Sequence, residues 1–206
     1  MARSKSSGRW LKEHFDDPYV KQAQREGYRS RAVYKLLEIQ ARDKILRPGI
    51  TVVDLGAAPG SWTQIAVGAT KPGGLVFALD ILAMEPLSGA DILLGDFREQ
   101  AVLDELLKRL DGRRVDLVLS DMAPNISGVE SVDQPRALYL AELALEFSRQ
   151  VLVSGGAFLV KVFQGQGSEE YLKTLRSDFA SLAIRKPKAS RPRSNEVYAL
   201  ARNFKL

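Results

Sequence analysis

Short apolar runs alternate along this chain with longer segments of helical periodicity, and this alternation is the strongest constraint on its fold. We expect strands at 51–55, 75–79, 91–94, 115–119 and 157–162, and helices at about 31–43, 61–69, 99–110, 135–152 and 168–179. Ser30 is a suitable N-cap for the first helix. Helices between successive strands are the crossovers that parallel strands require. The pattern predicts an α/β domain with helices on both faces of a mostly parallel sheet.

The chain ends in two further apolar runs, at 182–185 and 196–201, with no helix between them. Two strands joined without a crossover form a hairpin, so one of them is antiparallel to the rest of the sheet. We therefore expect seven strands with an antiparallel last strand. This architecture resembles the Rossmann-like fold of class I methyltransferases that use S-adenosylmethionine (SAM), a likeness that indicates the fold and not the chemistry.

Glycine and acidic residues follow the first three predicted strands, at the end of the sheet where ligands bind in such folds. A glycine-rich turn between Gly56 and Gly60 lets the backbone approach a ligand. Asp80, after the second strand, suits the two vicinal hydroxyls of a ribose. After the third strand, Asp96 could accept a hydrogen bond from an adenine amino group, and Phe97 could stack near the ring.

The spacing of the glycines discriminates between nucleotide classes. The dinucleotide fingerprint G-x-G-x-x-G has a glycine where its backbone approaches a pyrophosphate, and this chain has Ala58 there. A G-x-x-x-x-G-K-[ST] phosphate loop is absent from the sequence. The turn and the two acids together predict an adenosine ligand without a pyrophosphate, which is SAM. The same spacing disfavours an NAD-dependent oxidoreductase.

The chain contains no cysteine and a single histidine, His14. This excludes disulfides, thiolate metal sites, a cysteine nucleophile and any multi-histidine metal site. We expect no bound metal, although the composition leaves paired-carboxylate hydrolysis and magnesium chemistry open.

Basic residues are concentrated at the two ends of the chain. Residues 1–50 carry a net charge of +6, residues 51–184 of −7 and residues 185–206 of +6. Such ends could simply favour solubility, or they could form a phosphate-binding surface. We interpret residues 1–30 as a basic extension that contacts RNA, residues 31–206 as a single domain, and the run at 185–193 as an exposed loop. Aromatic residues among the N-terminal basic ones could stack on unpaired bases: Trp10, Phe15, Tyr19, Tyr28 and Tyr34.

The apolar runs are far shorter than the roughly 20 residues that span a bilayer. The N-terminus also lacks the apolar segment of a signal peptide. We therefore expect a cytoplasmic protein without a membrane partner. No heptad pattern is evident, which favours a monomer.

Four charged residues could converge at the chemical end of the sheet. Asp121 follows the fourth strand, Lys161 lies within the apolar fifth strand, and Glu196 opens the last strand. A lysine in an apolar strand is costly unless it finds a partner or reaches solvent. Taken singly, Glu196 fits an exposed strand end, and Lys35 fits a solvated helix face. Taken together, the four residues could place two cations and two anions beside the reacting groups.

Six segments together resemble the FtsJ/RrmJ (RlmE) family, which are bacterial 2′-O-ribose methyltransferases of large-subunit ribosomal RNA. They are SRA and KL within 30–36, DLGAAPG at 54–60, GDF at 95–97, SDMAPN at 120–125, VKVFQG at 160–165 and S-x-EVY at 194–198. They follow the family order over nearly the whole chain. The resemblance implies a catalytic tetrad of Lys35, Asp121, Lys161 and Glu196, and SAM contacts at Gly60, Trp62, Asp80, Asp96 and Asp121. A small departure is Ser61, where the family commonly has a second glycine, and we expect no loss from it.

The resemblance also implies a substrate, namely a uridine 2′-hydroxyl in the 23S rRNA of the large (50S) ribosomal subunit. Lys161 would act as the base or would stabilise the developing alkoxide. The sequence leaves both roles open, because burial and Lys35 favour the neutral amine whereas Asp121 and Glu196 favour the ammonium. Asp121 would orient Lys161, and Lys35 and Glu196 would position the ribose.

Three alternatives differ in what they require of these residues. A SAM-binding ribosome-assembly factor without catalysis would have a broken tetrad, and no tetrad position is altered here. A 2′-O-methyltransferase of another RNA would fit the same residues. A small-molecule O-methyltransferase would have no use for two basic ends.

Overall fold

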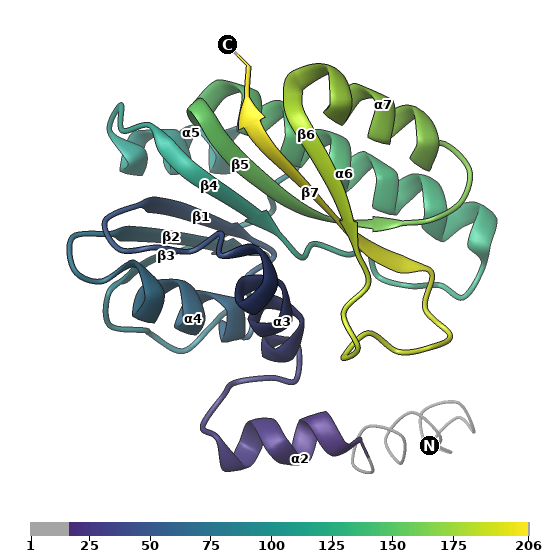
Figure 1. Cartoon of the computed structure of the whole chain (residues 1–206), viewed down its shortest axis with the longest axis horizontal. Coiled ribbons are helices and arrows are strands. Elements are labelled where there is room, and N and C mark those ends of the chain that lie inside the picture. Colours follow the sequence, from purple (N-terminus) through teal and green to yellow (C-terminus); the bar gives the residue numbers. More distant parts are fainter. Residues whose placement is uncertain (1–16, 206) are drawn as a thin grey trace.

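The computed structural model describes residues 17–205, which form one seven-stranded sheet between two layers of helices (Figure 1). The strands are β1 Thr51–Leu55, β2 Leu75–Asp80, β3 Ala90–Leu94, β4 Val115–Ser120, β5 Leu152–Phe163, β6 Phe179–Arg185 and β7 Glu196–Phe204. Their order across the sheet is β3-β2-β1-β4-β5-β7-β6. β7 is antiparallel to both β5 and β6, whereas β1 to β5 pair in parallel. The Rossmann-like α/β fold with an antiparallel last strand is confirmed.

The helices are α2 Pro18–Arg25, α3 Val33–Asp43, α4 Ser61–Thr70, α5 Gln100–Leu110, α6 Glu130–Val151 and α7 Ser168–Asp178. Helices α5, α6 and α7 cover one face of the sheet, where Phe147 of α6 and Phe158 of β5 belong to one hydrophobic core. Helices α3 and α4 cover the other face, where Leu36 of α3 and Leu159 of β5 belong to a second core. Neighbouring residues of β5 thus face opposite layers, as the pleat of a strand requires. Within residues 17–205, no helix is long and apolar enough to cross a membrane.

Helix α6 begins at Glu130, well before the predicted start at 135. The prediction was wrong because Pro135, a residue favoured in the first helical turn, lies inside this helix. Glu130 and Asp133 occupy the actual first turn, where negative charge is favourable. The Asp133 carboxylate also accepts hydrogen bonds from the N–H groups of Ser127 and Gly128, both at 2.9 Å. The loop before α6 is therefore held by the helix itself.

The N-terminal part of the described chain contains more structure than the sequence suggested. Helix α3 begins at Val33 rather than 31, and its N-cap is Ala32. Ser30 instead accepts a hydrogen bond from the N–H of Ala32 within the preceding turn. Helix α2 was not predicted, although Asp17 and the proline after it are ordinary start signals and the Asp17 side chain caps the helix. The other part of the predicted extension, 1–16, lies outside the described residues.

Candidate active site

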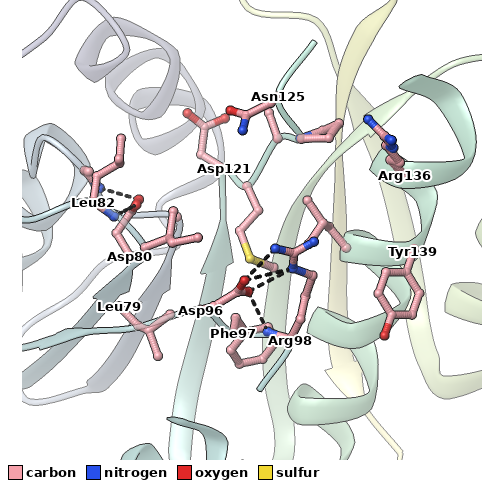
Figure 2. Close-up of a pocket in the computed structure, with 17 residues that line it drawn as sticks. Leu79, Asp80, Leu82, Asp96, Phe97, Arg98, Asp121, Asn125, Arg136 and Tyr139 are labelled. Atoms are coloured by element: carbon pink, nitrogen blue, oxygen red, sulfur yellow. Dashed lines mark hydrogen bonds and ion pairs between the residues drawn. The ribbon is translucent and has the colours of Figure 1, made fainter. Parts of the chain in front are cut away.

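A cavity of about 640 Å³ opens at the carboxyl ends of β1, β2, β3 and β4 (Figure 2). Apolar residues from the loop after β2 and polar residues from α6 complete its wall. Five of the seven residues predicted to contact the cofactor line it, namely Gly56, Asp80, Asp96, Phe97 and Asp121.

Asp80 organises the turn at 56–60 from the tip of β2. Its Oδ2 accepts a hydrogen bond from the N–H of Ala58, and its Oδ1 accepts one from the N–H of Leu82, both at 2.8 Å. Gly56 has a φ of +76°, and a Cβ there would lie 2.7 Å from the backbone nitrogen of Met122. Only glycine fits this position. Each Asp80 oxygen retains a second lone pair, so the carboxylate can still accept from ribose hydroxyls.

Asp96 and Phe97 occupy the end of β3, as predicted, but both already have partners. Arg98 forms a two-pronged ion pair with Asp96, which lowers the pKa of the Asp96 carboxyl. Phe97 is buried, and its ring meets that of Phe147 edge to face at 5.7 Å. Phe97 therefore forms an apolar floor of the cavity, and an adenine amino group at Asp96 would share the carboxylate with Arg98.

Gly60 and Trp62 do not line this cavity. The Trp62 side chain is buried, its Nε1 donates to the backbone oxygen of Ala32 at 2.8 Å, and its ring lies 5.6 Å from that of Tyr198. Gly60 lies under the side chain of Arg29. These positions support the site from outside rather than forming its wall.

The four predicted tetrad residues come together from four parts of the chain and form two ion pairs. Lys161 of β5 lies opposite Tyr198 of β7 in the strand register, and Glu196 shares the same face two residues away. That face packs against α3, which carries Lys35. The Nζ of Lys35 is 2.6 Å from Oε1 of Glu196. The Nζ of Lys161 is 3.0 Å from Oδ1 of Asp121 and donates to the Asp121 backbone oxygen at 2.6 Å.

Burial and ion pairing act in opposite directions on the two acids of the tetrad. Burial disfavours the Asp121 carboxylate, but Lys161 and Lys35 hold the pKa of Asp121 below its ordinary value. Burial likewise opposes charge on Glu196, and Lys35 holds the pKa of that carboxyl low. Both acids are therefore charged at neutral pH. Among the described residues, no group of three histidine, cysteine or acidic side chains could hold a metal ion.

Tyr198 completes the cluster and was not singled out in the sequence. Its hydroxyl donates to Oδ1 of Asp121 at 2.7 Å. Burial and the charge of Asp121 raise the pKa of Tyr198 well above its ordinary value, so the hydroxyl keeps its proton. A signal was present, since a tyrosine two residues after Glu196 in a strand lies on the same face.

A second cavity, of similar size, shares Ala123 with the first. Lys35, Lys161 and Glu196 line this second cavity, whereas Asp121 lines the first. The tetrad therefore lies where the two cavities meet. The remaining wall of the second cavity combines basic and acidic side chains with polar and apolar ones, including Arg31, Arg191, Glu130, Asp133, Gln134 and Ile126.

The basic run at 185–193 is partly buried, contrary to our prediction of an exposed loop. Arg185 makes a two-pronged ion pair with Asp43 of α3, at 2.7 and 2.8 Å. The N–H of Lys188 donates to Glu38 of the same helix at 2.8 Å. The prediction was wrong because these acidic partners are about 150 residues away in the sequence. The buried residues of the loop are Pro187, Ala189 and Ser190.

Asp54 is a buried acid directly beneath the glycine turn. Its Oδ2 accepts a hydrogen bond from the Thr63 hydroxyl at 2.7 Å, and its Oδ1 has no partner. Burial raises the pKa of Asp54 to about 7, against the opposing effect of Thr63. This carboxyl therefore exchanges its proton near neutral pH.

Comparisons with known proteins show the family and the fold to which this chain is similar. Residues 28–204 match the model of a family described as FtsJ-like methyltransferase. The chain is 59% identical, over 99% of both chains, to the ribosomal RNA large subunit methyltransferase E of Chromohalobacter salexigens. A crystal structure described as a ribosomal RNA methyltransferase from Plasmodium falciparum has 28% identity and a TM-score of 0.78, covering 86% of this chain and 98% of that one. A protein from Streptococcus mutans, described as a methyltransferase in complex with SAH, shares the fold at 12% identity and a TM-score of 0.53, covering 84% and 96%.

Proposed function

Since the chain belongs to the FtsJ-like methyltransferase family, we propose that it transfers a methyl group from SAM to the 2′-hydroxyl of a uridine in 23S rRNA. The observation that carries this proposal is the position of the tetrad at the junction of two cavities. A methyl donor and an acceptor must meet in line, so two adjoining cavities with charged groups at their junction suit a direct displacement.

The first cavity fits SAM. The Asp80 carboxylate can accept from ribose hydroxyls, and the apolar side chains of Leu82 and Phe97 can enclose an adenine. Asp121 offers a carboxylate to the positively charged methionine part at the junction end of the cavity. SAM supplies an electrophilic methyl group on a sulfonium, so the protein has no need of a covalent intermediate.

Lys161 acts as an ammonium that donates a hydrogen bond to the 2′-oxygen of the substrate, and the proton that this oxygen loses passes to solvent water. Its Nζ lies 3.0 Å from the Asp121 carboxylate and donates a hydrogen bond to the Asp121 backbone oxygen. An ammonium has three N–H donors, and two are used here. The third is available for the developing oxyanion. Asp121 orients Lys161, while the Lys35–Glu196 pair positions the ribose.

The second cavity fits a nucleotide of RNA. Arg191 can neutralise a phosphate, and the exposed side chain of Ile126 offers an apolar surface to a base. Arg31 also lines this cavity, but it is already paired with Asp17 at 2.7 Å. The basic residues of the extension at 1–30 and of the loop at 185–193 supply further cations for contacts with the RNA of the 50S subunit. A substrate in ribosomal RNA would place the protein in the cytoplasm. Both cavities and the tetrad are complete within one chain, which supports a monomer.

The proposal is tested by transfer of tritiated methyl groups from SAM to three acceptors in parallel. These are large ribosomal subunits from a strain lacking this protein, deproteinised 23S rRNA and a small catechol. We expect label in a 2′-O-methyluridine released from the subunits. Label only in another nucleoside or only in the catechol would contradict the proposal. SAM binding without any transfer would favour an assembly factor.

A further inference from the structure

Arg29, in the connection between α2 and α3, donates to backbone oxygens of two separate loops. Its Nη1 donates to the oxygens of Pro59 at 3.2 Å and Glu85 at 2.7 Å, and its Nη2 donates to that of Pro86 at 2.9 Å. All three acceptors are neutral carbonyls, so the contacts depend on the planar fork of the guanidinium rather than on an ion pair. Arg29 thus ties the turn at 56–60 to the 81–89 segment that follows β2.

These two loops form adjacent parts of the first cavity's wall. Ala58 of the turn and Leu82 of the 81–89 segment both line the cavity. Asp80 joins them from the cavity side by accepting a hydrogen bond from each N–H. Arg29, which does not line the cavity, makes a second connection between the same loops. Two independent connections fix the spacing of the wall.

Gly60 leaves room for the Arg29 side chain. A Cβ at this position would lie 2.7 Å from Nη1 and 3.2 Å from Cδ of Arg29, and the Gly60 φ of +104° is unfavourable for other residues. This contact gives Gly60 a physical role although it does not line the cavity.

The backbone of Arg29 is also held in place. Its N–H donates to Oε1 of Gln64 in α4 at 2.9 Å, and Nε2 of Gln64 donates to the oxygen of Gly27 at 3.2 Å. Helix α4 begins directly after the 56–60 turn. Gln64 therefore holds the backbone of Arg29 in a position from which the guanidinium reaches both loops.

We infer that Arg29 is a positioning residue for the methyl donor. Arg29 sets the spacing of the two cavity loops without touching SAM. This inference rests on the proposed use of SAM. It gives Arg29 a role in cofactor binding, whereas the sequence placed this residue in an extension that contacts RNA.

The test compares two variants of Arg29 with a matched control. Arg29→Gln removes the guanidinium, and Arg29→Lys keeps the charge but loses the fork that reaches both loops. Arg176→Gln removes an exposed arginine of α7 that lines neither cavity. Calorimetric titration with SAM alone is expected to show a Kd raised at least about tenfold in Arg29→Gln, about 1.4 kcal/mol. We expect a smaller increase in Arg29→Lys and no change in Arg176→Gln.

Steady-state kinetics with large ribosomal subunits separate positioning of SAM from general damage. The KM for SAM is expected to rise with the Kd, while kcat at saturating SAM and the KM for subunits stay within about threefold of wild type. Titrations in which both Arg29 variants bind SAM within twofold of wild type would overturn the inference. If Arg29→Gln does not fold, the Kd of Arg29→Lys for SAM tests the inference alone. A wild-type protein that binds no SAM would overturn the proposed function, and the inference with it.

Discussion

Tyr198 shows at the scale of one residue how the tetrad is held in place. Its hydroxyl and the Nζ of Lys161 both contact Oδ1 of Asp121. Tyr198→Phe removes this donor and keeps the ring against Trp62. We expect kcat to fall about tenfold, because a hydrogen bond to a charged group contributes roughly 1.5–3 kcal/mol, with the Kd for SAM unchanged. Tyr171→Phe is the control, since that buried hydroxyl donates to the Ala141 oxygen and lines neither cavity. Equal kcat values in the two variants would contradict this role.

The buried carboxyl of Asp54 makes the free energy of unfolding depend on pH. This carboxyl has a pKa of about 7 in the folded protein, against about 3.9 for an unperturbed aspartate. Between these values the folded state binds more protons, so the free energy of unfolding falls as the pH rises and levels off above about pH 7. The expected contribution between pH 5 and pH 8 is about 3 kcal/mol. Urea denaturation at several pH values should show a shallower dependence in Asp54→Asn, which has no proton to exchange. Matching pH profiles would contradict the prediction.

The functional residues differ in how far the sequence could reveal them. The resemblance to a known family predicted Lys35, Asp121, Lys161 and Glu196, and three of these charged residues also stood out at strand ends or within a strand. Their catalytic roles stay predictions. Arg29 could not be found this way, because its acceptors are backbone carbonyls about 30 and 56 residues further along the chain. Trp62 was assigned to cofactor binding by resemblance, and the structure places its ring in the core.

At the scale of elements, the strands were the most predictable part of the fold. A short apolar run such as β1 or β4 is buried in the sheet, and its apolar character alone is sufficient to predict a strand. The start of α6 and the shape of the β6–β7 loop were not predictable, because both depend on polar contacts. Asp133 binds the loop before α6, and Asp43 of α3 binds Arg185 at the end of β6.

The basic residues at the end of β6 and in the β6–β7 loop therefore have two different roles. Arg185 pairs with Asp43, whose side chain is only 7% exposed. Arg185→Gln therefore leaves this buried carboxylate with only the longer ion pair to Arg202, at 3.6 Å. We expect Arg185→Gln to lower the free energy of unfolding by about 1–3 kcal/mol. Arg191 lines the second cavity instead. Arg191→Gln should leave stability unchanged and reduce the slope of log K for RNA against log salt by about 0.7–0.9. Chemical denaturation and filter binding at several salt concentrations measure both effects, and the reverse pattern would contradict the assignment.

At the scale of the whole molecule, the sheet topology brings the two basic ends of the chain together. Strand β7 lies between β5 and β6, which places Glu196 beside Lys35 of α3. The β6–β7 loop contacts the same helix, so basic residues from both parts of the chain, such as Lys35 and Arg191, line the second cavity. The acidic middle of the chain forms the first cavity with its aspartates. The tetrad thus lies between a cavity in which acidic side chains outnumber basic ones and a cavity in which basic side chains outnumber acidic ones. We propose that the first holds the cationic donor and the second the RNA acceptor.

The most direct test of this account measures methyl transfer by Lys161→Ala together with its affinity for SAM. Tritiated SAM is incubated with large ribosomal subunits from a strain lacking the protein, and calorimetry gives the Kd for SAM of both proteins. The account predicts label in a 2′-O-methyl nucleotide with the wild type and none above background with Lys161→Ala, at equal affinity for SAM. Transfer by Lys161→Ala at a rate close to wild type would contradict the assignment of the tetrad as the site of reaction.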